Sequence, residues 1–459
     1  DGQRLRCGDL TVGMDSVIGG SGRIGAGGSD WAECLTVAHA VGTPALHAGR
    51  THAAAVAAGG YARVHPPFAA PLGERAVAQD ALALIAARSL AARALASTGA
   101  LAVDLGERPQ GLASCARSLA VEQASQIKLA AADLGLARSA LRPLLQGLEP
   151  QPTAEEPARL ARSTAYAASV LRSHQAFMRG LAAARAPNAA QALELFDAVL
   201  WEHVGHLASS GVRALVLGLT AGSLSTAAGR TDLVRGYCRR VNRYSAALSF
   251  AADLALTRLG ADLASHRPRT ALRAIREASR QTLTTWLGDA VAQLWLISCA
   301  LKRFEDEGVP EADRAVLEWI CADALRAVEE ALDKVVRHLS SPALSWLARL
   351  LIFPRGHAAL APDDGANRQV AQWLQDTTRL QGWRAECGPR LDVLGAALDA
   401  TLAGEPLEKS LGAAADATPA AQRIADAAVA GTLGEPQAHQ LSGWLEAVRR
   451  LRRPVASSS

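Results

Sequence analysis

The sequence predicts an all-α protein with a short β segment at its beginning. Of its 459 residues, 49% are hydrophobic, 20% are charged and only 4% are aromatic. Ala, Leu and Arg dominate the composition, and these residues favour helices, whereas sheets favour aromatic and β-branched residues. Long apolar periodicities with helical spacing give the same indication. The length and hydrophobic content are ample for a buried core and predict two or more packed units.

The clearest periodicity lies in residues 233–307, where two amphipathic helices are predicted. Apolar residues recur every three to five positions in each, which places one wide apolar stripe on each helix. Small residues line the first stripe, so a neighbouring helix can approach closely. We expect an antiparallel pair within a larger bundle. The stripe residues are Leu233, Tyr237, Val241, Tyr244, Leu248, Ala251, Leu254 and Leu259 in the first helix, and Leu283, Leu287, Ala290, Leu294, Ile297 and Leu301 in the second.

Four further helical segments precede this pair. Residues 75–103 and 109–147 are each predicted to form a long helix, and with helices at 31–58 and after 157 they would pack as a four-helix bundle. The second long helix is expected to run without a break from Ile127 to Leu141.

Small residues and a proline at 182–190 mark the best domain boundary. We therefore expect three parts: a β end and Gly-rich turn at 1–26, a helical bundle at 27–185, and a second helical domain at 190–455. In the last part, residues 311–340 and the very apolar stretch 341–354 continue the helical pattern.

Charge, cysteines and hydropathy exclude several classes of protein. A formal net charge of +4 is too small to indicate nucleic-acid binding. The seven cysteines form no C-x-x-C pair, which predicts reduced thiols and a cytoplasmic location. No unbroken apolar run reaches the roughly 18 residues that a membrane-spanning helix needs.

A literal G-x-G-x-x-G occurs at Gly20, Gly22 and Gly25. A dinucleotide-binding unit would need a second strand ending in an acid about 20 residues later. No Asp or Glu occurs between Glu33 and Glu74, so a flexible Gly-rich turn is favoured over a nucleotide site.

Glu202, His203 and His206 offer metal-ligand residue types on one predicted helix. No further strong ligand follows near these three residues, so no metal site is predicted.

Several stretches resemble the bacterial-type long-chain acyl-CoA dehydrogenases. They include S-A-A-L-S-F-A-A-D-L-A-L-T-R-L-G at 245–260, A-L-K-R-F-E-D-E-G at 300–308 and V-G-M-D-S-V-I-G-G at 12–20. The resemblance covers most of residues 8–450. It implies the C-terminal four-helix domain of that fold over 27–185, followed by the helical C-terminal extension of the family.

The resemblance also implies residues that contact FAD. The segment from Tyr61 to Phe68 resembles the family's Y-A-R-x-R-x-x-F motif, in which the second Arg and the Phe touch the flavin of a neighbouring subunit. The corresponding residues here are Arg63, His65 and Phe68. His65 replaces the second Arg, and a neutral imidazole is a poorer pyrophosphate partner. Where the family has its Gly-rich flavin loop, this chain has Leu129, Ala130 and Ala132.

The resemblance places the catalytic base at Glu155. In the family a Glu in a T-V-E-G loop removes the α proton of an acyl thioester, and here Thr153 and Leu160–Ser163 keep the frame. Such a base needs a water-poor loop and a raised pKa. The alternative is an ordinary helix start, with Thr153 as N-cap and Glu155, Glu156 and Pro157 in the first turn.

Two hypotheses of function remain open from the sequence. The first is FAD-dependent α,β-dehydrogenation of long-chain acyl-CoA in fatty-acid β-oxidation. The resemblance then implies electron-transfer flavoprotein as acceptor, a homo-oligomer, and an N-terminal half that is either cut away or on another polypeptide. The second is a catalytically degenerate helical scaffold or interaction subunit that no longer binds FAD.

The last predicted helix has an apolar face formed by Trp444, Leu445, Val448 and Leu451, with four arginines beside it. A solvated terminal helix is favoured over a peripheral contact with the inner membrane.

Overall fold

The computed structural model describes residues 38–107, 110–148, 207–264, 271–339, 341–411 and 418–453, together with a few isolated positions before residue 38 and at 205. Every regular element within these ranges is helical, which confirms the all-α prediction. The β segment expected at 1–26 and the domain boundary expected at 182–190 lie almost wholly outside the described residues.

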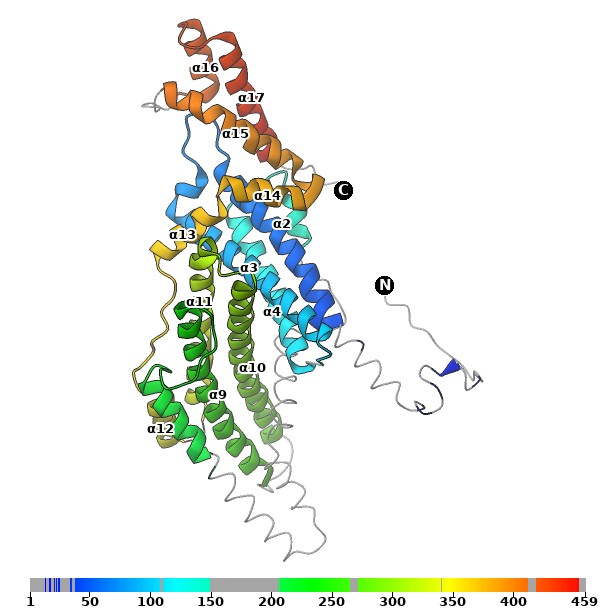
Figure 1. The fold of residues 1–459 in the computed structure, drawn as a ribbon, viewed down its shortest axis with the longest axis vertical. Helices are drawn as coiled ribbons and strands as arrows, with labels where there is room; N and C mark the ends of the chain where they lie inside the picture. Colours follow the sequence, from blue (N-terminus) through cyan, green and yellow to red (C-terminus); the bar gives the residue numbers. More distant parts are fainter. Residues whose placement is uncertain are drawn as a thin grey trace, which may run out of the picture.

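The helices form an elongated assembly in which the earlier and later parts of the chain interleave (Figure 1). The first group contains a π-helical turn at Ala38–Gly42, α2 (Thr43–Arg63), α3 (Ala76–Asp104), α4 (Gln110–Asp133) and the short α5 (Arg142–Gln146). The second group contains α9 (Asp232–Ala264), α10 (Ala271–Asp306), α11 (Arg314–Arg337), α12 (Pro342–Ile352), α13 (Asp364–Leu374), α14 (Thr377–Cys387), α15 (Asp392–Leu411), α16 (Ala420–Val429) and α17 (Glu435–Arg452).

Helix α3 lies at the centre of this assembly. It packs against α2 and α4 of the first group and against α10, α11 and α13 of the second. Its side chains Leu82, Ile85 and Leu95 are fully buried, and alanines fill most of the remaining contact surface. Because α3 is covered by both groups, one continuous core joins the two halves of the chain.

Two adjacent glycines let α2 approach the second group closely. A Cβ atom on Gly59 would lie 2.7 Å from the backbone oxygen of Leu374, and one on Gly60 would lie 2.9 Å from a methyl carbon of Leu394. Since real Cβ atoms do not make such short contacts, both positions require glycine or a shift of the neighbouring helices.

The helical pair predicted for 233–307 is confirmed by α9 and α10, which pack against each other. The helices expected at 311–340 and 341–354 are also present, as α11 and α12.

The prediction of an unbroken helix through 109–147 is wrong beyond residue 133. Helix α4 ends at Asp133, and Gly135 then adopts a left-handed conformation with φ of 92°. The amide of Gly135 donates to the carbonyl of Ala132, which closes the helix end before the next short turns. The apolar pattern continues past 133, but glycine terminates the helix because it reaches positive φ without steric cost.

By length and composition alone, α3 could cross a membrane, yet 56% of its most apolar stretch is buried inside the protein. Arg88 and Arg93 interrupt it, which is why the sequence shows no unbroken apolar run. Burial within the helical core accounts for this hydropathy without a bilayer.

Helices α15, α16 and α17 form a layer over the C-terminal end of α2 (Figure 1). Trp444, Val448 and Leu451 of α17 are each at most 2% exposed. The apolar face predicted for the last helix is therefore covered by protein. Close approach between α15 and α17 depends on Gly404, where a Cβ atom would lie 2.3 Å from the indole ring of Trp444.

We expect Gly404→Ala to destabilise the protein by about 1–3 kcal/mol, because the added methyl group overlaps the Trp444 ring. Urea unfolding followed by circular dichroism would measure the change. The control is Gly443→Ala in α17, where a Cβ meets nothing within 4 Å. There the higher helix propensity of alanine should stabilise by about 0.5–1 kcal/mol. Equal effects of the two substitutions would contradict the close packing at Gly404.

Candidate functional site

The segment predicted to contact a cofactor follows directly after α2. The helix ends at Arg63, Val64 is extended, and Pro66 and Pro67 prevent the helix from continuing. Phe68 then adopts a positive φ of 65°, which is uncommon for a bulky residue. The segment therefore turns sharply away from the axis of α2 and presents Arg63, His65 and Phe68 to the α15–α17 layer.

Arg63 is held by Glu405 of α15. Its Nη2 donates to Oε2 at 3.0 Å, and Nη1 lies 2.8 Å from Oε1. The two side chains are only 25% and 17% exposed, so this pair is screened less by solvent than a surface ion pair.

His65 is buried, with 4% of its surface exposed. Its ring packs edge-on against Trp444, with centroids 5.2 Å apart. Nδ1 donates to the carbonyl oxygen of Pro66 at 3.0 Å, and Nε2 lies 3.7 Å from Glu405. Both ring nitrogens therefore face groups of this chain.

Phe68 is also fixed by the C-terminal helices. Its backbone amide donates to the carboxylate of Glu408, and the Arg423 guanidinium lies 4.6 Å from the centre of its ring. The three residues predicted from the sequence are thus brought together. Each of them is in contact with α15, α16 or α17.

The partners of these residues were not identified from the sequence. Glu405, Glu408, Arg423 and Trp444 lie more than 300 positions away along the chain, and no local pattern links them to the 63–68 segment. The one sequence pattern that points to two of these partners is E-P-L-E at 405–408, because its spacing places Glu405 and Glu408 on one helix face.

Comparison with known proteins shows which family this helical architecture belongs to. A profile described as "Acyl-CoA dehydrogenase, C-terminal, bacterial type" matches residues 171–451. The chain belongs to this family. In the crystal structure of an acyl-CoA dehydrogenase from Bacillus anthracis, described as complexed with FAD, the fold is similar, with a TM-score of 0.50 and 14% identity. The match covers 76% of this chain and 56% of that dehydrogenase, so the chain spans little more than half its length.

Glu155, the predicted base of this acyl-CoA dehydrogenase family member, lies outside the described residues. The positions that the resemblance assigns to the family's Gly-rich loop fall on α4, where Leu129 is 67% exposed and Ala130 is buried. No turn occurs at 129–132, so the backbone there remains helical and its amides are used within the helix.

The 63–68 segment does not fit FAD in this arrangement. The cofactor's pyrophosphate is anionic, but the cation at Arg63 is already paired and two carboxylates, Glu405 and Glu408, border the segment. Arg63 is therefore not free to bind a pyrophosphate, and Trp444 covers the imidazole of His65 that would face the cofactor.

Metal ligands do not converge within the described part of the chain. No group of three or more His, Cys, Asp or Glu side chains is arranged there to hold an ion. Glu202, His203 and His206 lie outside it.

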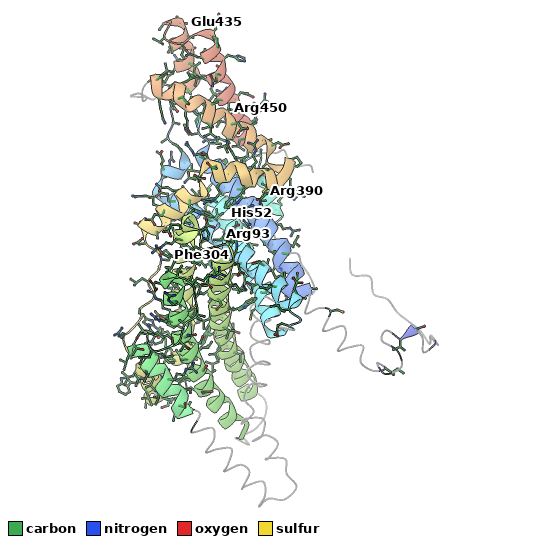
Figure 2. The ribbon with its side chains drawn as sticks, viewed as in Figure 1. His52, Arg93, Phe304, Arg390, Glu435 and Arg450 are labelled. Carbon is green, nitrogen blue, oxygen red and sulfur yellow. The ribbon has the colours of Figure 1, made fainter. Side chains whose placement is uncertain are left out.

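A second polar cluster surrounds His52, between α2, α3, α13 and α14 (Figure 2). The ring packs edge-on against Trp383 at 4.9 Å, and Nε2 lies 3.4 Å from Glu386, at the long end of hydrogen bonding. Burial and the Arg93 cation lower the pKa of His52 to about 4. The space beside it is only about 10 Å³, enough for at most one water molecule. The cluster is therefore a packed polar core and offers no room for a substrate.

We expect Glu405→Gln to cost about 1–3 kcal/mol of stability, because Arg63 would lose its carboxylate partner in a partly buried position. The matched control on the same helix is Asp399→Asn, which removes the exposed ion pair with Arg384 and should cost less than about 1 kcal/mol. Chemical unfolding would compare them. A cost for Asp399→Asn as large as that for Glu405→Gln would contradict the buried pair.

We also expect the protein to lose stability as the pH falls from about 6.5 to about 4. His52 is kept neutral in the folded state, whereas the unfolded chain binds a proton there already near its ordinary pKa. The loss from this one group should reach about 2–3 kcal/mol at pH 4.

His52→Gln should remove that share of the pH dependence in thermal unfolding. His439→Gln, on the exposed surface of α17, is the control and should retain the wild-type pH dependence. An unchanged slope in His52→Gln would show that protonation of His52 is not coupled to folding.

Proposed function

We propose that this chain is a helical scaffold subunit of the acyl-CoA dehydrogenase family that acts by association and does not hold FAD through its 63–68 segment. The observation that carries this proposal is the contact of Arg63 and His65 with Glu405 and Trp444. A cofactor could reach the buried ring of His65 only if α15 and α17 moved away.

Separating that layer has an energetic cost. Trp444 is 1% exposed, and full burial of a large apolar side chain stabilises by about 1.5–3 kcal/mol. The Arg63–Glu405 ion pair and the Phe68–Glu408 hydrogen bond would be broken in the same movement. A flavin would have to supply this free energy.

A second candidate is dehydrogenation of long-chain acyl-CoA, supported by family membership and by the Thr153, Glu155 and Leu160–Ser163 frame. In this proposal Glu155 takes the α proton, and an N-terminal half supplies the rest of the site. Electron-transfer flavoprotein would be the acceptor, in fatty-acid β-oxidation. For both candidates we propose a cytoplasmic homo-oligomer. Peripheral membrane contact would belong to surfaces other than the covered face of α17.

An absorbance spectrum after incubation with FAD distinguishes the two candidates. The purified chain, alone and mixed with the N-terminal half that the second candidate proposes, would be separated from free flavin by gel filtration. The scaffold proposal predicts no bound flavin in either sample and an oligomer that persists by light scattering.

A bound flavin that is bleached by palmitoyl-CoA would overturn the scaffold proposal and favour the enzyme. Glu155→Gln should then abolish bleaching, whereas the neighbouring Glu156→Gln should retain it.

A further inference from the structure

A groove of about 410 Å³ lies between α9, α11 and the loop that leads into α13. This volume falls within the range of about 300–1,000 Å³ that small-molecule sites occupy. One wall is Tyr237 and Arg240 of α9, another is Ala322 and Leu325 of α11, and the third is the loop at 358–363. None of these residues belongs to the 63–68 segment.

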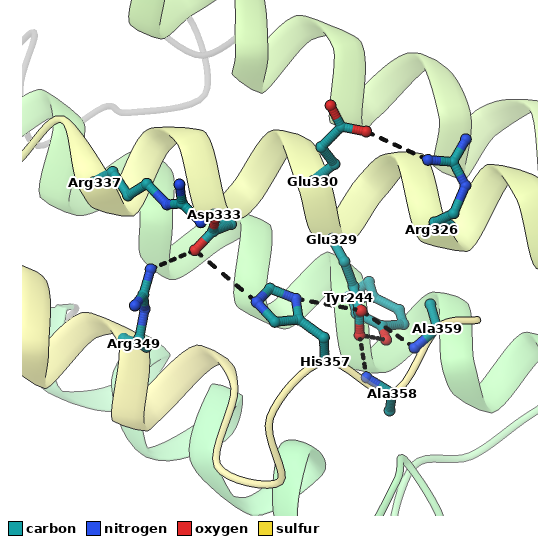
Figure 3. A network of polar contacts seen from close by, with 10 residues as sticks. All are labelled: Tyr244, Arg326, Glu329, Glu330, Asp333, Arg337, Arg349, His357, Ala358 and Ala359. Carbon is teal, nitrogen blue, oxygen red and sulfur yellow. Dashed lines mark hydrogen bonds and ion pairs between the residues drawn. The ribbon is translucent and has the colours of Figure 1, made fainter. Parts of the chain in front are cut away.

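The loop wall is fixed by a buried carboxylate. Glu329 of α11 is 2% exposed and accepts hydrogen bonds from the amides of Ala358 and Ala359 at 3.0 and 3.1 Å. The hydroxyl of Tyr244 also donates to it, and His357 Nδ1 lies 3.5 Å away (Figure 3). Charge-assisted hydrogen bonds of this kind are about twice as strong as neutral ones, so the groove keeps its shape without a ligand.

The long walls of the groove are largely apolar. Leu325 and the small side chains Ala315 and Ala322 contribute from α11, and Ala359 and Leu360 from the loop. Leu360 is 78% exposed at the rim, where its side chain is accessible to an apolar chain lying in the groove. The indole N–H of the neighbouring Trp319 already has a hydrogen-bond partner, because Nε1 donates to Oδ1 of Asn367 at 2.7 Å.

One cation, Arg240, and two carboxylates, Glu318 and Asp363, line the groove. Glu318 accepts from Arg314 at 3.0 Å, and Asp363 accepts from the amide of Ala366 at 2.8 Å as the N-cap of α13. Within the described part of the chain, Arg240 has no carboxylate at ion-pair distance. Its guanidinium lies 5.0 Å from the centre of the Tyr237 ring.

Stacking on an aromatic face uses the plane of a guanidinium and leaves its edge N–H groups free to donate. Those groups match the oxygens of a carboxylate or phosphate. The Tyr237 hydroxyl has no hydrogen-bond partner among the described residues, and burial raises its pKa, so it remains protonated and able to donate.

We propose that this groove binds an anionic amphiphile, with a carboxylate or phosphate head at Arg240 and Tyr237 and an apolar chain along Ala322, Leu325 and Leu360. The combination of one free cation at the mouth and apolar walls recognises both parts of such a molecule. This binding goes beyond the scaffold proposal and requires neither FAD nor Glu155.

Isothermal titration calorimetry with four probes tests the proposal on the full chain. Dodecanoate and dodecyl phosphate, kept below their micelle concentrations, represent the two sources of an anionic head. Dodecanol lacks the charge, and inorganic phosphate lacks the chain. At least one of the two anionic chains should bind, and whichever binds more tightly identifies the head group. Dodecanol and inorganic phosphate should each bind at least about tenfold more weakly, because each lacks one of the two recognised parts.

Two substitutions locate the site. Arg240→Gln should weaken binding of the anionic chain about tenfold and leave dodecanol unchanged, since it removes only the charge-assisted bonds. Arg239→Gln, one position earlier on the exposed surface of α9 and not lining the groove, is the control and should bind like the wild type.

Ala322→Phe should fill the groove and prevent binding of all chains, with an unchanged thermal melting curve as evidence of folding. No binding of either anionic probe to the wild-type chain would overturn the proposal. Binding that survives Arg240→Gln at full strength, or Ala322→Phe in a folded protein, would also overturn it.

Discussion

Burial of α3 on almost all sides is the constraint on which the structure depends. The helix contacts α2 and α4 from the first part of the chain and α10, α11 and α13 from the second. Its alanines keep the helix narrow, so five neighbours approach it closely enough to exclude water from Leu82, Ile85 and Leu95. Arg88 of α3 adds a polar link, because it pairs with the largely buried Asp323 of α11. The two halves of the chain therefore form one core.

Close packing between helices also explains why the 63–68 segment contacts α15 and α17. Gly59 and Gly60 let α2 lie against Leu374 and Leu394. This contact places the start of α15 beside α2 and brings Glu405 to Arg63. Once these elements are in place, Trp444 closes over His65. The ion pair and the aromatic contact thus follow from helix packing, and together they account for a segment that resembles a flavin contact yet faces its own chain.

Hydrogen bonds to a buried carboxylate shape the groove beside α9 and α11. Its outer wall has no regular structure, so its backbone amides need partners from elsewhere. Glu329 supplies them from within the core, and the neighbouring Asp333 is paired with Arg337 and Arg349 (Figure 3). A buried carboxylate thereby converts an irregular loop into a fixed surface, with Arg240 free to interact with a ligand at its edge.

The sequence by itself determined the helical class, the α9–α10 pair and the family, because apolar periodicity and short motifs are local properties of the chain. It also identified Arg63, His65 and Phe68 as one group. It did not reveal the helix end at Gly135, where the apolar pattern continues but a left-handed glycine stops the helix. Only the tertiary structure decided what these side chains contact. Glu405, Glu408 and Trp444 meet them across more than 300 residues, and such contacts depend on how helices pack around α3. Packing of that kind is set by the summed shapes of many side chains, which no local pattern in a single sequence encodes.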